Sequence, residues 1–550
     1  MRPPPFDEHF HAVAAVFRHP GLRRLELAWG GYYVGEWTQF VALSVYAFEH
    51  GGAIAVGLFG VTRMGAAAVA LPFGGVLTDR YPRARVLFAS YLLRAAALAA
   101  TAVAIGADAP RAAVFALAAL AAVGAAPIRP ATMSVVPLLA RTPQELVAAN
   151  VSSSSLEGLG TLTGPLIGGL ATAWAGPATA VALAAVVQCA CAGAVLGVVG
   201  GGEPPVRAGV TRGLAAVVAG VKTLREDAGP RLIVLLAGAQ TFVRGVLNVL
   251  LTAAALGVLG VGESGVGWLN ATLGAGAVVG SVATVGLVNR RRLAGMFALA
   301  LVLWGSPIAL IGIVPHATVA FAALAVVGLG NALLDVSGFT LLQRTVDDHV
   351  LGRVFGAFEI LCAAGIAAGS GLGAVAVHEL GVRTTFVAAG CILPGLALLT
   401  RRGLSRIDDT SRVPQPQLGL LAAVPLFAPL PVTTLERLAA RSQWQEVEAG
   451  ETVIAEGTTG ESFYVVASGR VEVSRSGSRL RVLEPGDSFG EIALLRDTMR
   501  TATCRALTDL VLYELDRATF VAAVSGDLRS AAAADELVES RLAPAKLPEG

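Results

Sequence analysis

The chain has 550 residues, of which 55% are hydrophobic and only 15% are charged, and its mean hydropathy is +0.68. A soluble globular chain carries about 25% charged residues, so this composition excludes a protein that is dissolved in water along its whole length. The formal net charge of +2 argues against nucleic acid as a partner, because nucleic acid requires a strongly basic surface.

The charges are distributed unevenly along the chain. Residues 1–400 contain 24 Lys and Arg with 18 Asp and Glu, whereas residues 401–550 contain 17 and 21. The charge density therefore more than doubles at this boundary, which predicts a membrane part followed by a water-exposed part. The five cysteines show no metal-ligand spacing, so we expect no metal cofactor.

The membrane part begins after a short polar segment. Residues 1–24 contain acids and no clean apolar stretch, which predicts a cytoplasmic N-terminus without a cleavable signal peptide. Six apolar stretches of about 20 residues follow within 25–200, and six more lie within 231–400. The predicted spans are 25–48, 54–77, 86–106, 111–139, 150–174, 177–199, 231–258, 265–288, 293–314, 317–340, 353–377 and 383–400.

The orientation of these spans is predicted by the positions of Lys and Arg. With the N-terminus inside, the inner loops hold fourteen basic residues and the outer loops hold two, Arg111 and Arg383. We therefore expect a multi-pass bacterial inner-membrane protein with both termini in the cytoplasm. The central cytoplasmic loop 201–230 is basic, and residues 211–227 have the pattern of an amphipathic surface helix.

The stretch "GGVLTDRYPRARVL", residues 74–87, lies between the second and third spans. It resembles the loop signature of the major facilitator superfamily, with Pro82 where that family usually has glycine. The resemblance implies a gating loop that latches the cytoplasmic ends of two six-helix halves, and the alternative is a plain basic loop. The matching residues are Gly75, Asp79, Arg80, Arg83 and Arg85.

A second stretch, "GTLTGPLIGG" at 160–169, resembles the signature of the antiporter branch of that family, whose members are exporters. Small residues four apart allow helix backbones to approach closely, so ordinary helix packing is the alternative explanation. Residues 143–150 and 341–356 are also similar to drug- and siderophore-exporting members. The matching signature residues are Gly160, Gly164, Pro165, Gly168 and Gly169.

Several charged residues fall inside the predicted spans, where a charge costs about 2.5–3.5 kcal/mol or more. Glu36 is the strongest candidate, because a mid-span carboxyl can carry a proton or bind a cationic substrate; its alternative role is an ion pair with Arg63. Five charged residues are expected closer to the cytoplasmic side: Arg94, Arg129, Glu157, Asp335 and Glu359. The candidates for proton coupling or substrate binding are Glu36, Arg63, Arg129, Glu157 and Arg244.

After a polar linker at 401–417, short alternating stretches separated by glycines predict a β-roll with flanking helices. Residues 418–541 resemble the cyclic nucleotide-binding domain of bacterial regulators, kinases and gated channels, through "FGEIALL" (489–495) and "RTAT" (500–503). The resemblance implies cAMP or cGMP as a regulatory ligand.

The residue chemistry fits such a ligand. Backbone N–H groups after Gly490 and the guanidinium of Arg500 suit a cyclic phosphate, Glu491 suits a ribose 2′-hydroxyl, and Thr501 can reach phosphate or base. The implied contacts are Gly490, Glu491, Ile492, Ala493, Arg500, Thr501 and Ala502.

The predicted fold is therefore an all-α membrane bundle of twelve helices, arranged six plus six, followed by a cytosolic β-roll. We expect a transporter and no enzyme, because the sequence shows no activated nucleophile, metal motif or phosphate-hydrolysing loop. The expected function is proton-coupled export of a small molecule, regulated by a cyclic nucleotide. The alternatives are a transport-inactive membrane receptor for the nucleotide and an exporter of the nucleotide itself.

Overall fold

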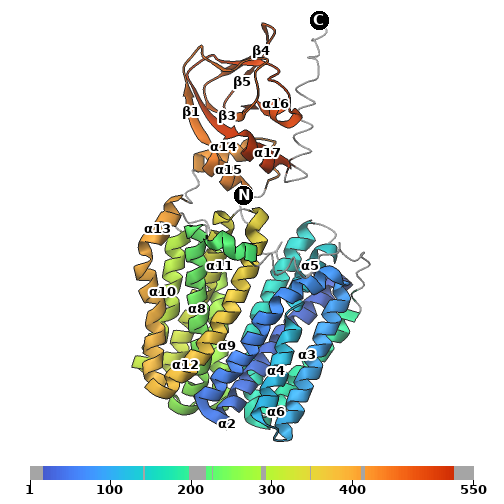
Figure 1. Ribbon diagram of the computed structural model, residues 1–550, viewed down its shortest axis with the longest axis vertical. Helices are drawn as coiled ribbons and strands as arrows, with labels where there is room; N and C mark the ends of the chain where they lie inside the picture. Colours follow the sequence, from blue (N-terminus) through green and yellow to red (C-terminus); the bar gives the residue numbers. More distant parts are fainter. Residues whose placement is uncertain are drawn as a thin grey trace. The chain divides into compact units, whose positions relative to one another are not determined.

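The structure is a computed structural model that describes residues 16–139, 143–196, 198, 218–225, 227–285, 293–346, 348–410, 415–430, 432–525 and 530. The chain divides into two compact units, Met1–Asp408 and Asp409–Gly550. Figure 1 shows a first unit built of helices and a second unit that contains the strands.

The first unit consists of long helices. They form two bundles that lie side by side, α2–α6 and α8–α12 (Figure 1). The helices are α2 (Pro20–Arg80), α3 (Arg83–Gly106), α4 (Arg111–Ala125), α5 (Ile128–Leu139), α6 (Pro143–Leu196), α8 (Ala228–Ala253) continued by a π-helical turn (Ala254–Val258), α9 (Gly262–Val285), α10 (Leu293–Ile313), α11 (Ala317–Thr345), α12 (Asp348–Leu399) and α13 (Arg401–Thr410).

Within the described residues, eight helices are long and apolar enough to cross a membrane. Three of them, with 59, 49 and 50 residues, are each interrupted by non-helical glycine, at Gly51–Gly52, Gly176 and Gly381. Since one crossing needs about 20 residues, each of these three helices supplies two crossings, which brings the total to eleven. Helix α9 has 24 residues, which is long enough for a twelfth crossing. The predicted twelve-helix bundle is confirmed.

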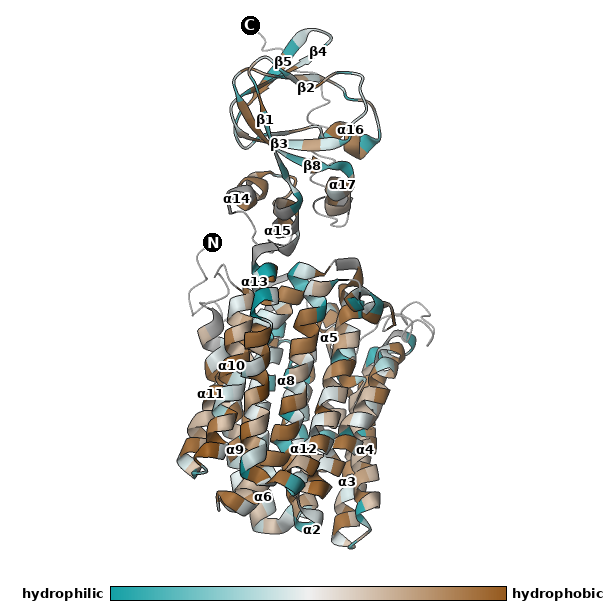
Figure 2. Ribbon diagram, turned by 60° about the vertical axis from the view of Figure 1, so that its left-hand side comes forward, coloured by the Kyte–Doolittle hydropathy of each residue, from teal (hydrophilic) through white to brown (hydrophobic). Residues whose placement is uncertain are grey.

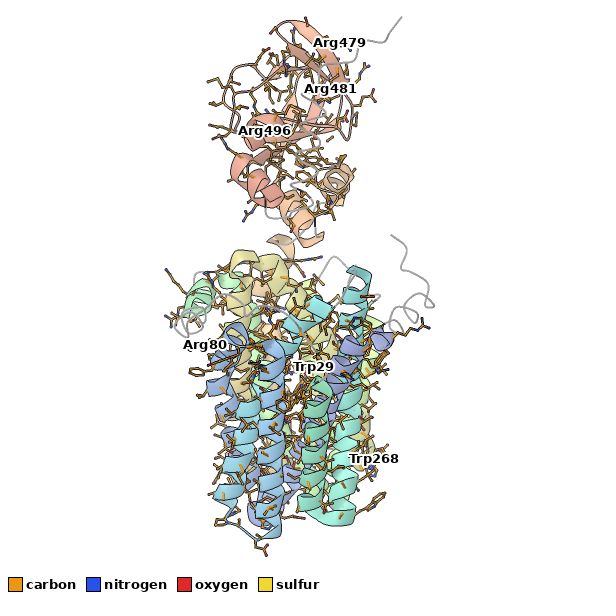
Figure 3. All side chains as sticks on the ribbon, turned by 90° about the vertical axis from the view of Figure 1, so that its right-hand side faces the viewer. Trp29, Arg80, Trp268, Arg479, Arg481 and Arg496 are labelled. Carbon is orange, nitrogen blue, oxygen red and sulfur yellow. The ribbon has the colours of Figure 1, made fainter. Side chains whose placement is uncertain are left out.

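The outer surface of the first unit is suited to lipid. Hydrophobic residues predominate along the lengths of the helices, whereas α13 is hydrophilic (Figure 2). Large apolar side chains are exposed, among them Trp174 at 83% and Leu399 at 80%. Arg80 and Trp268 lie toward opposite ends of the bundle (Figure 3).

The glycines of the 160–169 signature lie where helices approach each other most closely. Gly160, Gly164 and Gly168 face the first crossing of α2, and a Cβ placed on Gly164 would lie 2.7 Å from the Cβ of Trp37. Gly169 faces the opposite way, because its Cβ would lie 2.9 Å from the Cα of Gly267 in α9. One helix segment therefore packs tightly against both bundles.

The gating-loop signature lies almost entirely on helices. Between α2 and α3 only Tyr81 and Pro82 are non-helical, and Pro82 has φ −54° at the start of α3, a geometry that proline adopts without strain. A Cβ on Gly75 would meet open space, whereas one on Gly74 would lie 2.6 Å from the carbonyl oxygen of Ala126. The close contact is therefore made by Gly74, which directly precedes the signature residue Gly75.

The remaining signature residues sit at these helix ends. Asp79 belongs to α2, and its side chain lies outside the described part of the structure. Arg80 is the last residue of α2 and lies over the ring of Tyr81, 5.8 Å from its centroid. Arg83 donates to the carbonyl oxygen of Ser134 at 3.3 Å, which ties the start of α3 to α5.

The predicted linker at 401–417 begins as a helix of the first unit. Leu404 and Ile407 of α13 are buried in its hydrophobic core. The Asp408 carboxylate accepts hydrogen bonds from the backbone N–H groups of Ala294 at 2.8 Å and Gly295 at 3.1 Å. A carboxylate at a helix N-terminus is stabilising, so Asp408 fixes α13 to the first turn of α10.

The second unit is a roll of two antiparallel four-stranded sheets, in the orders β1-β8-β3-β6 and β2-β7-β4-β5. Phe427, Phe463 and Phe520 pack the flanking helices against the first sheet. The elements are α14 (Gln415–Ala423), α15 (Val432–Arg441), β1 (Gln443–Val447), β2 (Thr452–Ile454), β3 (Ser462–Ser468), β4 (Val471–Arg475), β5 (Ser478–Leu483), β6 (Ser488–Phe489), α16 (Glu491–Arg496), β7 (Thr503–Ala506), β8 (Leu510–Asp516) and α17 (Arg517–Ser525).

The predicted β-roll with flanking helices is therefore confirmed. Three other predictions lie partly outside the described residues. They are the N-terminal segment 1–24, described from residue 16, the loop 201–230, and the domain 418–541, of which 431, 526–529 and 531–541 are not described. Of the central loop, residues 218–225 are described and are helical.

We predict that Gly164→Ala lowers the stability of the protein, because its new methyl group has no room against Trp37. Overpacking of this kind costs about 1–3 kcal/mol. The control is Gly75→Ala, whose methyl group meets open space inside a helix, so that stability should stay equal or rise by about 0.5–1 kcal/mol. Thermal unfolding of the purified protein in detergent compares the two, and equal melting temperatures would contradict the prediction.

Candidate functional site

The seven residues that the sequence singled out in 489–503 line a single cavity of the second unit. The cavity encloses about 400 Å³, part of it open to solvent. Five further residues from the strands complete the lining, and the sequence analysis did not identify them. They are Ile454 on β2, Val473 on β4, Arg481 on β5, Phe489 on β6 and Cys504 on β7.

Gly490 shapes the entrance to α16. Its φ of 94° is left-handed, a conformation that side chains rarely adopt. A Cβ at this position would also lie 2.7 Å from Nη1 of Arg500 and 3.0 Å from the carbonyl oxygen of Ser462. Only glycine fits both the backbone conformation and the space, which keeps Arg500 close to the start of α16.

Arg500 is held in place by the protein itself. Its Nη1 donates to the carbonyl oxygen of Gly490 at 2.8 Å, and its Nη2 donates to that of Ser462 at 2.7 Å. The residue is 7% exposed, and burial lowers the pKa of its guanidinium. A cation that is partly stripped of water, with donors still directed at the cavity, is suited to bind an anion.

Glu491 is the first residue of α16 and is 1% exposed at the wall of the same cavity. A carboxylate accepts hydrogen bonds, so the cavity combines an acceptor for hydroxyl groups with a cation for an anionic group. Thr501 is also anchored, since its carbonyl oxygen accepts from Nε of Arg475 at 2.9 Å. Arg481 of β5 adds a second cation to the cavity lining. Its alternation with Arg479 was the signal available in the sequence.

In the first unit, Glu36 lies between two arginines. It forms ion pairs with Arg63, from the second crossing of α2, and with Arg94, from α3. Gln39 donates to the same carboxylate at 2.7 Å, and Arg94 donates to the carbonyl oxygen of Ala121 at 3.0 Å. The ion pair with Arg63 that the sequence left open is present, and Arg94 is a partner that sequence reasoning missed.

This arrangement favours a permanently charged Glu36. The side chains of Glu36 and Arg63 are 16% and 12% exposed, and that of Arg94 is fully buried. Protonation of Glu36 would leave two buried guanidinium groups without a counter-charge, which is strongly unfavourable. The geometry therefore supports a structural role that joins α2 to α3.

The other charged candidates lie apart from this cluster. Glu157 of α6 interacts electrostatically with Tyr33 of α2, and Arg129 of α5 does so with Glu157 and with Glu359 of α12. Arg244 of α8 lies over the ring of Trp37, 5.9 Å from its centroid. The structure thus separates the five predicted residues into a Glu36–Arg63 pair, a Glu157–Arg129 group and Arg244.

The family model described as Major Facilitator Superfamily matches residues 27–237 and 233–444, which together make up more than half of the chain. The chain belongs to the major facilitator superfamily. A second model, described as Cyclic nucleotide-binding domain, matches residues 444–527. The protein is therefore a multi-pass membrane protein that combines a major facilitator transporter domain with a cyclic nucleotide-binding domain.

Curated relatives match over smaller parts of the chain. A cAMP-dependent protein kinase regulatory subunit from Yarrowia lipolytica is 36% identical over 156 residues, which are 28% of this chain and 41% of the relative. The cGMP-dependent protein kinase egl-4 from Caenorhabditis briggsae is 46% identical over 72 residues, 13% of this chain and 10% of the relative. The chain spans less than half the length of these relatives.

Among solved structures, the regulatory domain of Toxoplasma gondii PKA with cAMP is 34% identical to this chain. The match covers 20% of this chain and 43% of that one, with a TM-score of 0.19.

We predict that Glu36→Gln destabilises this major facilitator domain. Removal of one partner from a buried ion cluster costs about 3–5 kcal/mol, because the other charges stay buried. Glu359→Gln is the control: Glu359 is exposed and, among the described residues, has no ion pair, so its loss should change stability by about 0.5 kcal/mol or less. Unfolding in detergent measures both variants, and a Glu36→Gln protein as stable as the control would argue against a structural cluster.

Proposed function

We propose that this protein is a proton-coupled exporter of a small molecule in a bacterial inner membrane, and that cyclic nucleotide binding to its C-terminal domain in the cytoplasm regulates it. The observation that carries the proposal is the complete cavity around Arg500 and Glu491, in a chain whose other unit is a major facilitator domain.

The cavity supplies what a cyclic nucleotide requires. Hydrogen bonds to the protein already fix Arg500 beside the start of α16. A cyclic phosphate bound there would form the polar contacts that the buried guanidinium no longer makes with water. Glu491 would accept the ribose 2′-hydroxyl. The matched relatives carry the names of both cAMP- and cGMP-dependent proteins, and either nucleotide fits this chemistry. The hydroxyl of Thr501 is the feature that can favour cGMP.

Export and proton coupling rest on the first unit. The 160–169 glycines resemble the exporter signature and pack α6 against both bundles. Because Glu36 is committed to two arginines, Glu157 is the better proton carrier: it is half-buried and, in the described ranges, forms no direct ion pair. A carboxyl without a direct ion pair can exchange a proton with less loss of electrostatic stabilisation.

Helix α13 provides a route from nucleotide binding to transport. Asp408 holds the end of α13 on the first turn of α10, and α14 of the second unit begins at Gln415. The chain between the end of α13 at Thr410 and the start of α14, residues 411–414, spans at most about 18 Å when fully extended. Displacement of α14 on ligand binding would therefore act on α10 through a short connection. Allosteric coupling of this kind is typically worth about 1–3 kcal/mol.

We predict that Arg500→Ala weakens cAMP and cGMP binding about tenfold or more, equivalent to about 1.4 kcal/mol, because the fixed guanidinium is lost. Arg496→Ala is the matched control, since Arg496 is an exposed arginine of α16 that does not line the cavity. Calorimetry on the full-length protein measures both. Equal affinities for the two variants would refute the assignment of the site.

We predict that cyclic nucleotide changes the proton-antiport rate of the intact protein in inverted vesicles, with a pH-sensitive dye as the reporter and a panel of amphipathic compounds as cargo. Arg500→Ala should abolish the response by loss of binding. Asp408→Ala should bind nucleotide normally and respond weakly, because α13 loses its hold on α10.

Three outcomes would contradict parts of the proposal. Transport that nucleotide never alters would exclude regulation. Absence of any transport would favour a membrane-anchored receptor. Accumulation of the labelled nucleotide itself would make the nucleotide the cargo.

A further inference from the structure

The amide of Asn331 in α11 lies between a cation and an anion. Its Oδ1 accepts hydrogen bonds from Nε1 of Trp304 at 3.1 Å, from Nη1 of Arg244 at 3.4 Å and from Nε2 of Gln240 at 3.5 Å. Its Nδ2 donates to Oδ2 of Asp335 at 2.9 Å. The amide therefore keeps Arg244 at one end and Asp335 at the other.

This spacing leaves both charges without a direct counter-charge. In the described ranges, neither Arg244 nor Asp335 has an oppositely charged side chain within the 4 Å of an ion pair. An isolated charge inside a membrane is costly, and direct pairing would be the simplest way to reduce that cost. Two opposite charges held apart by an amide remain available to a third partner.

The site faces the first bundle. Arg244 lies over the ring of Trp37 in α2, at 5.9 Å. Asp335 is exposed. It interacts electrostatically with Arg244 across the Asn331 amide, and also with Glu157 and Arg129 of the first bundle. An exposed carboxylate directed at the opposite bundle borders the region between the two halves of the transporter domain, where a transported molecule must pass.

The geometry points to a zwitterionic substrate, a small molecule with one negative and one positive group, and we propose that Arg244, Asn331 and Asp335 bind it. The negative group pairs with Arg244, the positive group pairs with Asp335, and the ring of Trp37 contacts the apolar body. This inference rests on the proposed transport function and specifies its substrate class.

The Glu36 cluster shows why this site differs from a structural one. There the carboxylate contacts both arginines directly, and no unpaired charge remains on Glu36. At Asn331 the opposite charges are present in equal number but do not meet. A ligand that carries both charges satisfies Arg244 and Asp335 together, whereas a purely anionic or cationic ligand leaves one of them unmatched.

The test uses two matched series of probes with the purified full-length protein in detergent. The first contains phenylalanine as the zwitterion, N-acetylphenylalanine as the anion and phenylalanine amide as the cation, and the second contains the corresponding tryptophan compounds. We expect the zwitterion of at least one series to bind about tenfold more tightly than its anion and its cation. Arg244→Gln should shift the preference to the cation, and Asp335→Asn should shift it to the anion.

A third variant tests the spacer. Asn331→Leu removes the amide and lets Arg244 and Asp335 pair directly, so zwitterion binding should fall about tenfold while both charges are retained. Asn248→Leu, one turn beyond Arg244 on α8, is the matched control and should bind as the unmodified protein does.

The proposal is overturned if neither zwitterion binds more tightly than its matched ions, if no probe binds, or if the charge variants weaken all three probes of a series equally. The last result would mean that the residues only support the fold. Because binding in detergent requires no transport, a negative result here leaves the transport proposal standing. A protein that binds the zwitterion but moves no cargo would instead contradict transport alone.

Discussion

A charged group that is removed from water must be matched by another polar group, and this constraint governs both units of the protein. In the membrane unit, Glu36 can lie inside the bundle because Arg63 and Arg94 neutralise it. In the nucleotide-binding unit, two backbone carbonyl groups hold Arg500 without cancelling its charge. A carboxylate partner neutralises an arginine, and the resulting cluster stabilises the fold. A carbonyl partner leaves the charge of the arginine in place, so that it can still attract a ligand.

The same distinction between charged and neutral partners applies to the polar residues Arg244, Asn331 and Asp335. The neutral amide of Asn331 forms hydrogen bonds to both Arg244 and Asp335, so the two charged groups do not form a direct ion pair with each other. Close packing elsewhere makes such a region possible. The glycines of α6 allow α2 and α9 to pack closely against one helix.

Much of the fold was predictable because its signals are local. Apolar stretches of membrane length identified the crossings, and even the three very long helices break at glycine, near the ends of the predicted spans. The nucleotide cavity was predictable for a similar reason: its main residues fall within fifteen positions, 489–503. Arg481 was missed because it reaches the cavity only through the pairing of strands.

Contacts between distant residues were not predictable from one sequence. Arg94 lies 58 positions from Glu36, and nothing in its own apolar surroundings indicates which helix it faces. Helix α13 was interpreted as a linker because its composition is polar, with Leu404 and Ile407 as its only large apolar residues. Its docking depends on Asp408 meeting a helix that begins 115 positions earlier, at Leu293.

The position of Asp408 also determines where this protein can be divided. Sequence composition suggests a cut near residue 400, where the last membrane helix ends at Leu399. A chain shortened there would lose the carboxylate that completes the first turn of α10, and with it the apolar side chains of α13. Such a truncated transporter would be altered in its own fold as well as deprived of its cyclic nucleotide-binding domain. A clean separation of the two modules must leave residues 401–408 with the membrane part, so the end of the transporter is defined by a helix cap and lies beyond its last apolar residue.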